Sequence, residues 1–106
     1  MELLKKTAVD IRKALLSKEV SAVELTEATY KRIEDVEDKI GAYNSLTKEY
    51  ALDTAKEVDK KIAAGETLPK MAGIPLALKD NINLKGYKTT ASSKILENFT
   101  SPYDAT

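Results

Sequence analysis

A lysine and an aspartate follow directly after an uncharged, apolar run, and they are the residues of this chain best suited to acid–base chemistry. Residues Gly73 to Leu78 carry no charge, and the next two residues are Lys79 and Asp80. The run predicts a buried strand, and open α/β sheets place their ligand chemistry at the C-terminal ends of strands. Because burial removes hydration from an ammonium and makes the neutral amine accessible, Lys79 is a candidate proton acceptor.

Two further interpretations of this region stay open. Lys79 can instead extend from the strand end into solvent and pair with Asp80 or another carboxylate, which is a structural role. Ser92 and Ser93 supply hydroxyls that could form a local dyad with Lys79. Serines in such a segment more often cap turns through hydrogen bonds, so the structural role is the expected one for both serines.

The composition restricts the chemistry that these residues can perform. The chain has 106 residues with no Cys and no His, which excludes disulfide scaffolds, Cys/His zinc sites and nucleophile systems that depend on an imidazole within this chain. Seventeen basic residues balance seventeen acidic ones, so no net field attracts nucleic acid or an anionic membrane. No apolar run is long enough to cross a bilayer, and the charged start is unlike a secretory signal, so we expect a cytoplasmic location.

Three helices are predicted in the first 65 residues. Their expected bounds are Thr7 to Ser17, Ser21 to Gly41 and Thr47 to Ala64. Ser21 and Glu24 have the spacing of a capping box, and Val20 and Leu25 that of a hydrophobic staple. Apolar residues recur at helical spacing on one face of each of the two longer helices. The predicted buried stripes are Ala22, Leu25, Thr29, Ile33, Val36 and Ile40, and then Ala51, Ala55, Val58 and Ile62.

The rest of the chain predicts short extended pieces and turns. We expect a weak strand from Ala42 to Leu46, the strand from Gly73 to Leu78, an extended piece at Thr89 and Thr90, and a short helix from Ser92 to about Asn98. The predicted fold class is therefore α/β, with N-terminal helices followed by the first strands of a mixed sheet. Residues 1–65 are mainly helical, and residues 66–106 form the strand and loop region that carries Lys79. A strand that is apolar on both faces needs neighbours, so residues 1–106 are expected to be part of a single, incomplete domain.

Several short motifs together resemble one enzyme family. They are Gly73-Ile74-Pro75, Lys79-Asp80-Asn81, Gly86, Thr89 to Lys94, Leu96 to Phe99 and Tyr103 to Thr106, with Ser21 to Leu25 and Ala42 to Ser45 nearer the N-terminus. This combination resembles the amidase signature family over essentially the whole chain. Within that family it is most similar to the glutaminase subunits of tRNA-dependent amidotransferases. The family commonly has Gly where this chain has Ser92.

The resemblance implies a function that these 106 residues carry only in part. Family members use a triad of Ser, cis-Ser and Lys, in which the lysine matches Lys79 and both serines lie well downstream. In the whole enzyme the serine attacks the glutamine side-chain amide, and the released ammonia goes to a separate subunit. The implied partners are the B and C subunits and misacylated Glu-tRNA(Gln) or Asp-tRNA(Asn), and the assembled complex uses ATP with magnesium. With one triad member, the chain alone is expected to be inactive.

Two alternatives remain beside this hypothesis. A stand-alone amidase that hydrolyses another carboxamide would share Lys79. A truncated chain could also serve as a non-catalytic helical interaction module. The sequence that follows Thr106 would separate these possibilities, because a Gly/Ser-rich segment favours an enzyme and a native stop codon favours the module.

Overall fold

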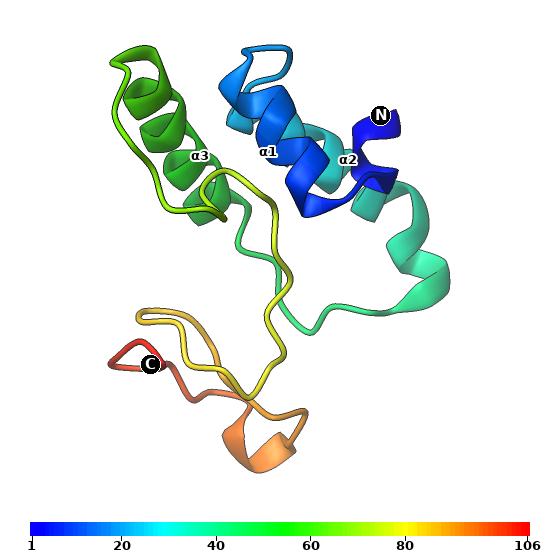
Figure 1. The fold of residues 1–106 in the computed structure, drawn as a ribbon. Helices are drawn as coiled ribbons and strands as arrows, with labels where there is room; N and C mark the ends of the chain where they lie inside the picture. The colour runs from blue at the N-terminus through cyan, green and yellow to red at the C-terminus, as the bar shows by residue number, and fades with distance from the viewer. The chain divides into compact units, whose positions relative to one another are not determined.

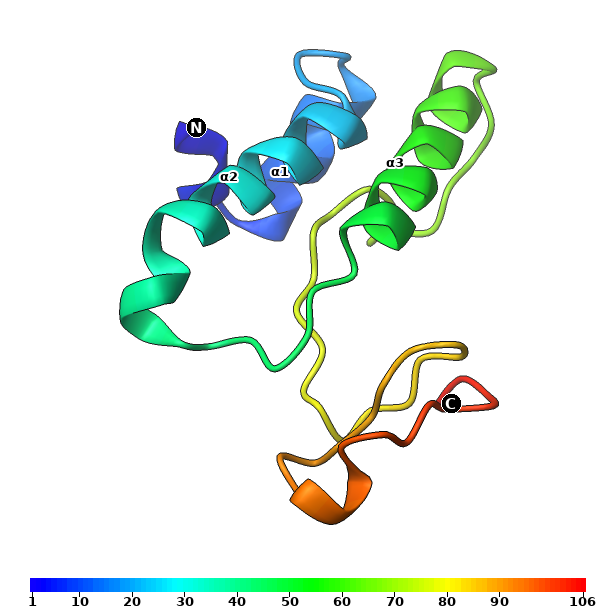
Figure 2. The same ribbon diagram turned by 180° about the vertical axis from the view of Figure 1, so that it is seen from behind.

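The chain forms two compact units. The computed structural model describes all 106 residues. We call residues 1–40 and 48–75 the helical unit, and residues 41–47 and 76–106 the loop unit. Figures 1 and 2 show that the long helices all belong to the first of these, whereas the second follows an irregular course. None of the helices combines the length and the apolar character needed to span a bilayer.

The three α-helices of the helical unit begin and end close to the predicted residues, and a short 3-10 helix that was not predicted precedes them. In chain order the helices are the 3-10 helix η1 (Glu2–Lys5) and the α-helices α1 (Ala8–Leu16), α2 (Ala22–Ile40) and α3 (Lys48–Ala63). The predicted capping box of α2 is present, because Ser21 Oγ accepts from the Glu24 N–H at 3.0 Å and Glu24 Oε2 accepts from the Ser21 N–H at 2.8 Å. Thr7 likewise caps α1 through the N–H of Asp10. The three α-helices confirm the helical part of the predicted fold.

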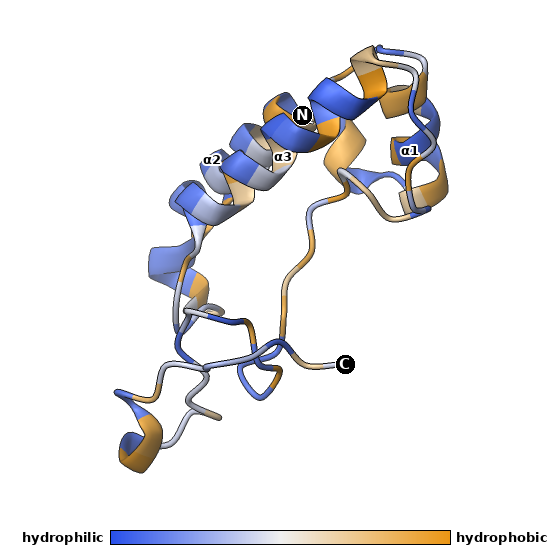
Figure 3. Cartoon of the chain, turned by 90° about the vertical axis from the view of Figure 1, so that its left-hand side faces the viewer, coloured by the Kyte–Doolittle hydropathy of each residue, from blue (hydrophilic) through white to orange (hydrophobic).

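A small apolar core joins α1, α2 and α3. Its buried members are Ile11, Ala14, Leu15, Val20, Ala22, Leu25, Ala55 and Val58. Figure 3 shows that α2 and α3 each carry apolar residues on part of their surface and hydrophilic residues on the rest. The predicted stripe on α2 is wrong at its C-terminal end, because Ile40 is 64% exposed. The α2 residues that belong to this core lie near the start of the helix, so an apolar residue at its far end has no core to join.

The loop that follows α3 packs closely on this core. Gly73 adopts φ +81°, and a Cβ at this position would lie 3.1 Å from Leu15 Cδ1 and 3.1 Å from Val58 Cγ1. The Arg12 guanidinium donates a hydrogen bond of 2.9 Å to the Pro69 carbonyl oxygen and so ties the same loop to α1. Gly73 is therefore required both by the backbone conformation and by the lack of space.

The predicted strands are not formed. Residues 74–79 and residues 42–46 have no strand hydrogen bonding. Within the run from Gly73 to Leu78, Leu76 is 74% exposed and Leu78 is 45% exposed. Backbone groups of a strand must pair with a neighbouring strand, and no segment of these 106 residues pairs with either stretch. The sheet of the predicted α/β fold is thus absent from this structure.

The loop unit is held together by turns and isolated backbone pairs. Its only β contact is a single antiparallel bridge between Lys88 and Thr100, next to the predicted extended piece at Thr89. The predicted short helix is present only as the 3-10 helix η2 (Lys94–Leu96). The Asp104 carboxylate accepts the Lys85 N–H at 2.7 Å and anchors the last residues of the chain to the turn before the bridge.

Candidate functional site

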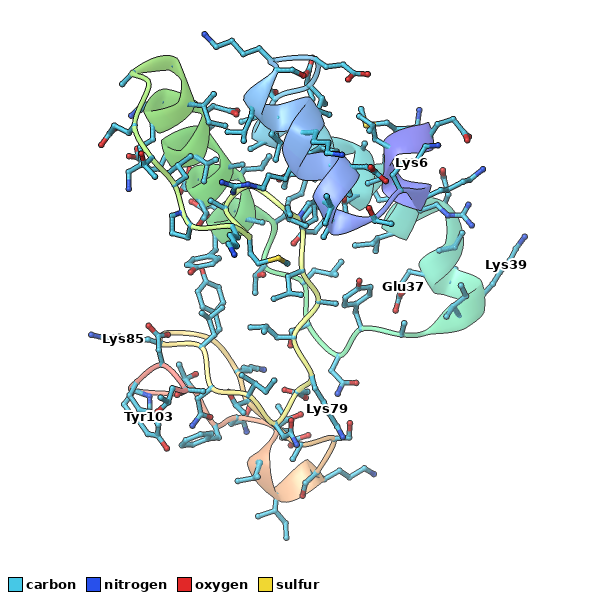
Figure 4. The ribbon with its side chains drawn as sticks, in the orientation of Figure 1. Lys6, Glu37, Lys39, Lys79, Lys85 and Tyr103 are labelled. Atoms are coloured by element: carbon cyan, nitrogen blue, oxygen red, sulfur yellow. The ribbon has the colours of Figure 1, made fainter.

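Lys79 ends the extended segment that leads into the loop unit. Its side chain is exposed, so the burial expected for it is not present among these 106 residues, and it makes no hydrogen bond or ion pair with any of them. The predicted ion pair between Lys79 and Asp80 is not formed. The Asp80 carboxylate instead accepts hydrogen bonds from Asn44 and Thr90. Figure 4 labels Lys79, with Lys85 well separated from it in the same unit. The amine is free to meet groups that these residues do not supply.

Asp80 is the centre of a hydrogen-bond cluster. Its carboxylate accepts the Thr90 N–H at 2.9 Å, the Thr90 hydroxyl and the Asn44 side-chain amide at 2.8 Å. Its backbone carbonyl accepts the Ala91 N–H at 2.7 Å. The same Asn44 amide nitrogen also lies 2.9 Å from Ser92 Oγ. We call Asn44, Asp80, Thr90, Ala91 and Ser92 the Asp80 cluster, and all of it belongs to the loop unit.

The cluster keeps the Asp80 carboxylate ionised. The hydrogen bond from the Thr90 hydroxyl, followed by those from the Thr90 N–H and the Asn44 amide, lowers the pKa of Asp80 from 3.8 to about 2. Hydrogen bonds to a carboxylate favour its charged form. Near neutral pH, Asp80 is therefore an acceptor of hydrogen bonds and has no proton to donate.

The turn that Asp80 contacts has a strained backbone. Ala91 has φ +50° and Ser92 has φ +56°, and the Ser93 N–H donates to the Thr90 carbonyl oxygen at 2.8 Å to close the turn. Two successive residues of this kind are typical of a type I′ turn, which favours Asn and Gly. Ser92 is thus in a conformation that glycine adopts without steric cost, which fits the Gly that the family resemblance leads us to expect at this position.

The structure does not join Lys79 to either candidate serine. Ser92 Oγ accepts a hydrogen bond from Asn44, and Ser93 closes the turn through its backbone. Among the described residues no hydrogen bond connects Lys79 with Ser92 or Ser93. Both serines have the turn-forming role that was expected of them.

Three members of the Asp80 cluster, Asn44, Thr90 and Ala91, were not predicted as site residues. Asn44 lies 36 residues before Asp80 in the sequence, and no motif or period links the two positions. The sequence gives one indication of this cluster. Asp80 is a carboxylate at the end of an apolar run, and such a group needs a hydrogen-bond partner. That signal identifies Asp80 but not the residues that bind it.

Comparison with known proteins assigns the chain to a family. The family model described as Amidase matches residues 24–106, which include all of the Asp80 cluster and Lys79. The chain therefore belongs to the amidase family.

Two relatives are similar to the chain over its full length. The chain is 52% identical over its full length to the A subunit of the glutamyl-tRNA(Gln) amidotransferase of Desulforamulus reducens, and 53% identical to that of Carboxydothermus hydrogenoformans. In both cases the aligned part is 22% of the relative, so the chain spans about a fifth of their length.

A solved structure has the same fold over this stretch. It is described as an unexpected vestigial protein complex that reveals the evolutionary origins of an s-triazine catabolic enzyme. The TM-score is 0.89 at 31% sequence identity, with 93% of this chain and 22% of that chain covered. The fold of this chain thus also occurs within a much longer polypeptide.

Proposed function

We propose that this chain is the N-terminal portion of the glutaminase subunit of a glutamine-dependent tRNA amidotransferase, and that Lys79 is its catalytic lysine. The observation that carries the proposal is the identity of about half of all residues, over the whole chain, to subunits named for that activity. Within these residues the Lys79 amine is exposed and has no hydrogen-bond partner, so the burial that favours its neutral form has to come from the rest of the enzyme. The complete subunit would release ammonia from glutamine for transfer to Glu-tRNA(Gln) or Asp-tRNA(Asn).

The proposed mechanism gives Lys79 the work of moving a proton. A serine from the remainder of the enzyme attacks the carboxamide carbon of glutamine, and its proton passes through a second serine to the neutral amine of Lys79. Lys79 then returns a proton to the departing ammonia, while backbone N–H groups stabilise the oxyanion. Transfer of ammonia to the misacylated tRNA, with ATP and magnesium, is assigned to the assembled complex with its B and C subunits.

The test compares Lys79→Ala, Lys79→Arg and the wild type in the complete, assembled enzyme. Arginine keeps the positive charge but cannot give up its proton, so both variants should lose glutaminase activity to a similar extent. Removal of a general base lowers a rate by about a hundred- to ten-thousand-fold. Ammonia release from glutamine measures the rate, and circular dichroism checks that each variant is folded.

A neighbouring lysine provides the matched control. Lys85 is exposed and belongs to the same unit, so Lys85→Ala removes the same charge without touching the proposed proton acceptor. It should keep nearly full activity. A Lys79→Arg enzyme with a large fraction of wild-type turnover would contradict the proposal and leave Lys79 with a structural role.

A second candidate function is hydrolysis of another carboxamide by a stand-alone amidase. The structure that shares this fold at 31% identity is described by its relation to an s-triazine catabolic enzyme, which supports a substrate other than glutamine. Glutamine and a panel of simple carboxamides, given to the same purified enzyme, separate the two functions. Preference for a carboxamide other than glutamine, still dependent on Lys79, would select the second candidate.

The 106 residues alone should not hydrolyse glutamine. The proposed nucleophile and its serine relay come from elsewhere in the enzyme, and neither Ser92 nor Ser93 forms a hydrogen bond with Lys79. Ammonia release by the purified chain, abolished by Lys79→Ala, would show instead that a local Ser–Lys dyad is sufficient.

A further inference from the structure

We propose that Asp80 is a positioning residue that fixes the backbone from which Lys79 projects. This inference rests on the proposed function of Lys79. It adds a role for the neighbouring carboxylate and for the residues that bind it. Asp80 would act through Lys79 and through the turn at residues 90–93, without touching the substrate.

The geometry shows how Asp80 restrains its neighbour. A residue linked by a peptide bond to a fixed residue has few backbone torsions left to vary, and Asp80 is held both by its carboxylate and by its backbone carbonyl. The backbone of Lys79 itself is also bonded, because its carbonyl oxygen accepts the Ile82 N–H at 3.0 Å and closes a turn that contains Asp80. The Lys79 backbone is thus fixed, while its exposed side chain stays available.

The strained turn gives an independent reason for a functional role. Ala91 and Ser92 both occupy the left-handed region, which L-residues avoid. Such a conformation persists only where surrounding contacts determine it, and strained residues of this kind cluster at functional sites. Three of those contacts come from Asp80, through the Thr90 N–H, the Thr90 hydroxyl and the Ala91 N–H.

A purely structural role would predict a different outcome. If Asp80 only stabilised the loop unit, its loss would lower the amount of folded enzyme and leave the properties of the folded fraction unchanged. If Asp80 positions Lys79, its loss changes the reactivity of the Lys79 amine and the rate of the chemical step. Displacement of a catalytic group by about 1 Å can lower a rate by about a hundredfold.

The experiment uses Asp80→Asn in the complete, assembled enzyme. The amide keeps the shape of the carboxylate but replaces one acceptor oxygen with an NH2 group. This group is a donor and would face the donors of Thr90 and Asn44. We expect kcat for glutamine hydrolysis to fall by about ten- to a hundredfold, with a much smaller change in KM. Modification of Lys79 by trinitrobenzenesulfonate, followed by mass spectrometry across a pH series, reports directly on the amine and should show a changed pH profile.

A matched variant and a rescue sharpen the result. Asp104 also accepts a backbone N–H in the loop unit, that of Lys85, so Asp104→Asn makes the same chemical change away from Lys79. It should leave both kcat and the Lys79 profile unchanged. A double variant that carries both Asn44→Asp and Asp80→Asn again pairs a carboxylate with an amide at these two positions. It should recover part of the lost kcat. If Asp80→Asn does not fold, Thr90→Val removes the hydroxyl that donates to Asp80 and accepts the Ser92 N–H at 3.2 Å, and it should show the same kinds of change.

The outcomes separate this inference from the proposed function. A folded Asp80→Asn enzyme with wild-type kcat and a wild-type Lys79 profile would overturn the positioning role, even if Lys79→Ala abolishes activity. If Lys79→Ala is fully active, the proposed function fails. A changed Lys79 profile in Asp80→Asn would then still show that Asp80 positions the amine.

Discussion

The helical unit and the loop unit are stabilised in different ways. The buried residues of the helical unit include the apolar cluster around Leu25, whereas the buried residues of the loop unit are Thr89 and Ser101. Full burial of a leucine side chain contributes about 1.5–3 kcal/mol, and a typical hydrogen bond contributes about 0.5–1.5 kcal/mol net. The helical unit is therefore stabilised mainly by buried apolar side chains, whereas the loop unit depends on hydrogen bonds and carries the candidate chemistry.

The largest expected effect on stability is in the core of the helical unit. Leu25 is completely buried, so Leu25→Ala should lower the free energy of unfolding by about 2–5 kcal/mol. Thermal unfolding followed by circular dichroism at 222 nm measures the loss. The control is Ile95→Ala in the loop unit, where the side chain is 93% exposed and the change should be within about 0.5 kcal/mol. Equal losses of unfolding free energy in Leu25→Ala and Ile95→Ala would show that the two units are not stabilised in different ways.

Gly73→Ala should be the next most damaging change. The new Cβ meets Leu15 and Val58 at 3.1 Å, and the residue must keep φ +81°. We expect a loss of about 1–3 kcal/mol from crowding together with the unfavourable backbone. Gly41→Ala is the matched control, because it has φ +61° and no atom within 4 Å of the new Cβ. A chemical denaturation curve for each variant separates crowding from backbone strain, and equal losses would rule out the crowding.

Acid should loosen the loop unit through Asp80. Its pKa is lowered to about 2 in the folded chain, so the stabilising contribution is complete above the unfolded value near 4 and is lost as the pH falls toward 2. An NMR titration of the Asp80 carboxyl carbon measures the midpoint directly. The Thr90→Val variant removes the largest cause of the shift and should raise that midpoint. A wild-type midpoint at or above 3.8 would show that the Asp80 cluster does not form in solution.

The smallest expected effect is a gain in stability at the strained turn. Ala91 has φ +50°, and glycine adopts this region without steric cost, so Ala91→Gly should stabilise the loop unit by about 0.5–1 kcal/mol. Ser92→Gly relieves the same strain but loses the hydrogen bond from Asn44, and it should gain less. Amide hydrogen exchange of the turn measures both. Ala105→Gly, at a position without positive φ, should give no gain.

The two units also differ in how far their structure could be predicted from the sequence. The bounds of α2 followed from the Ser21–Glu24 capping box and from Gly41, because caps and helical periods involve residues a few positions apart. The strand from Gly73 to Leu78 was not found, since an apolar run does not reveal whether a pairing partner exists.

The candidate site was predictable only at Lys79 and its neighbour. The apolar run and the charge after it marked the position, and the structure adds that the Lys79 amine is exposed. Asn44 could not be found, because a single hydrogen bond between residues 36 positions apart leaves no local pattern. The catalytic role of Lys79 stays a prediction, which the kinetic comparison of Lys79→Ala with Lys79→Arg addresses.

The start of α2 has a consequence for the order of folding. Besides its own cap, this helix end is bound by Asp59 of α3, whose two carboxylate oxygens accept the Ala22 N–H at 2.7 Å and the Val23 N–H at 3.1 Å. Helix N-terminal N–H groups have no partner inside their own helix. During synthesis on a ribosome, the first turn of α2 therefore obtains its final acceptors only after α3 has been made and has docked. The two helices should become ordered together, even though α2 is complete in sequence long before Asp59 leaves the exit tunnel.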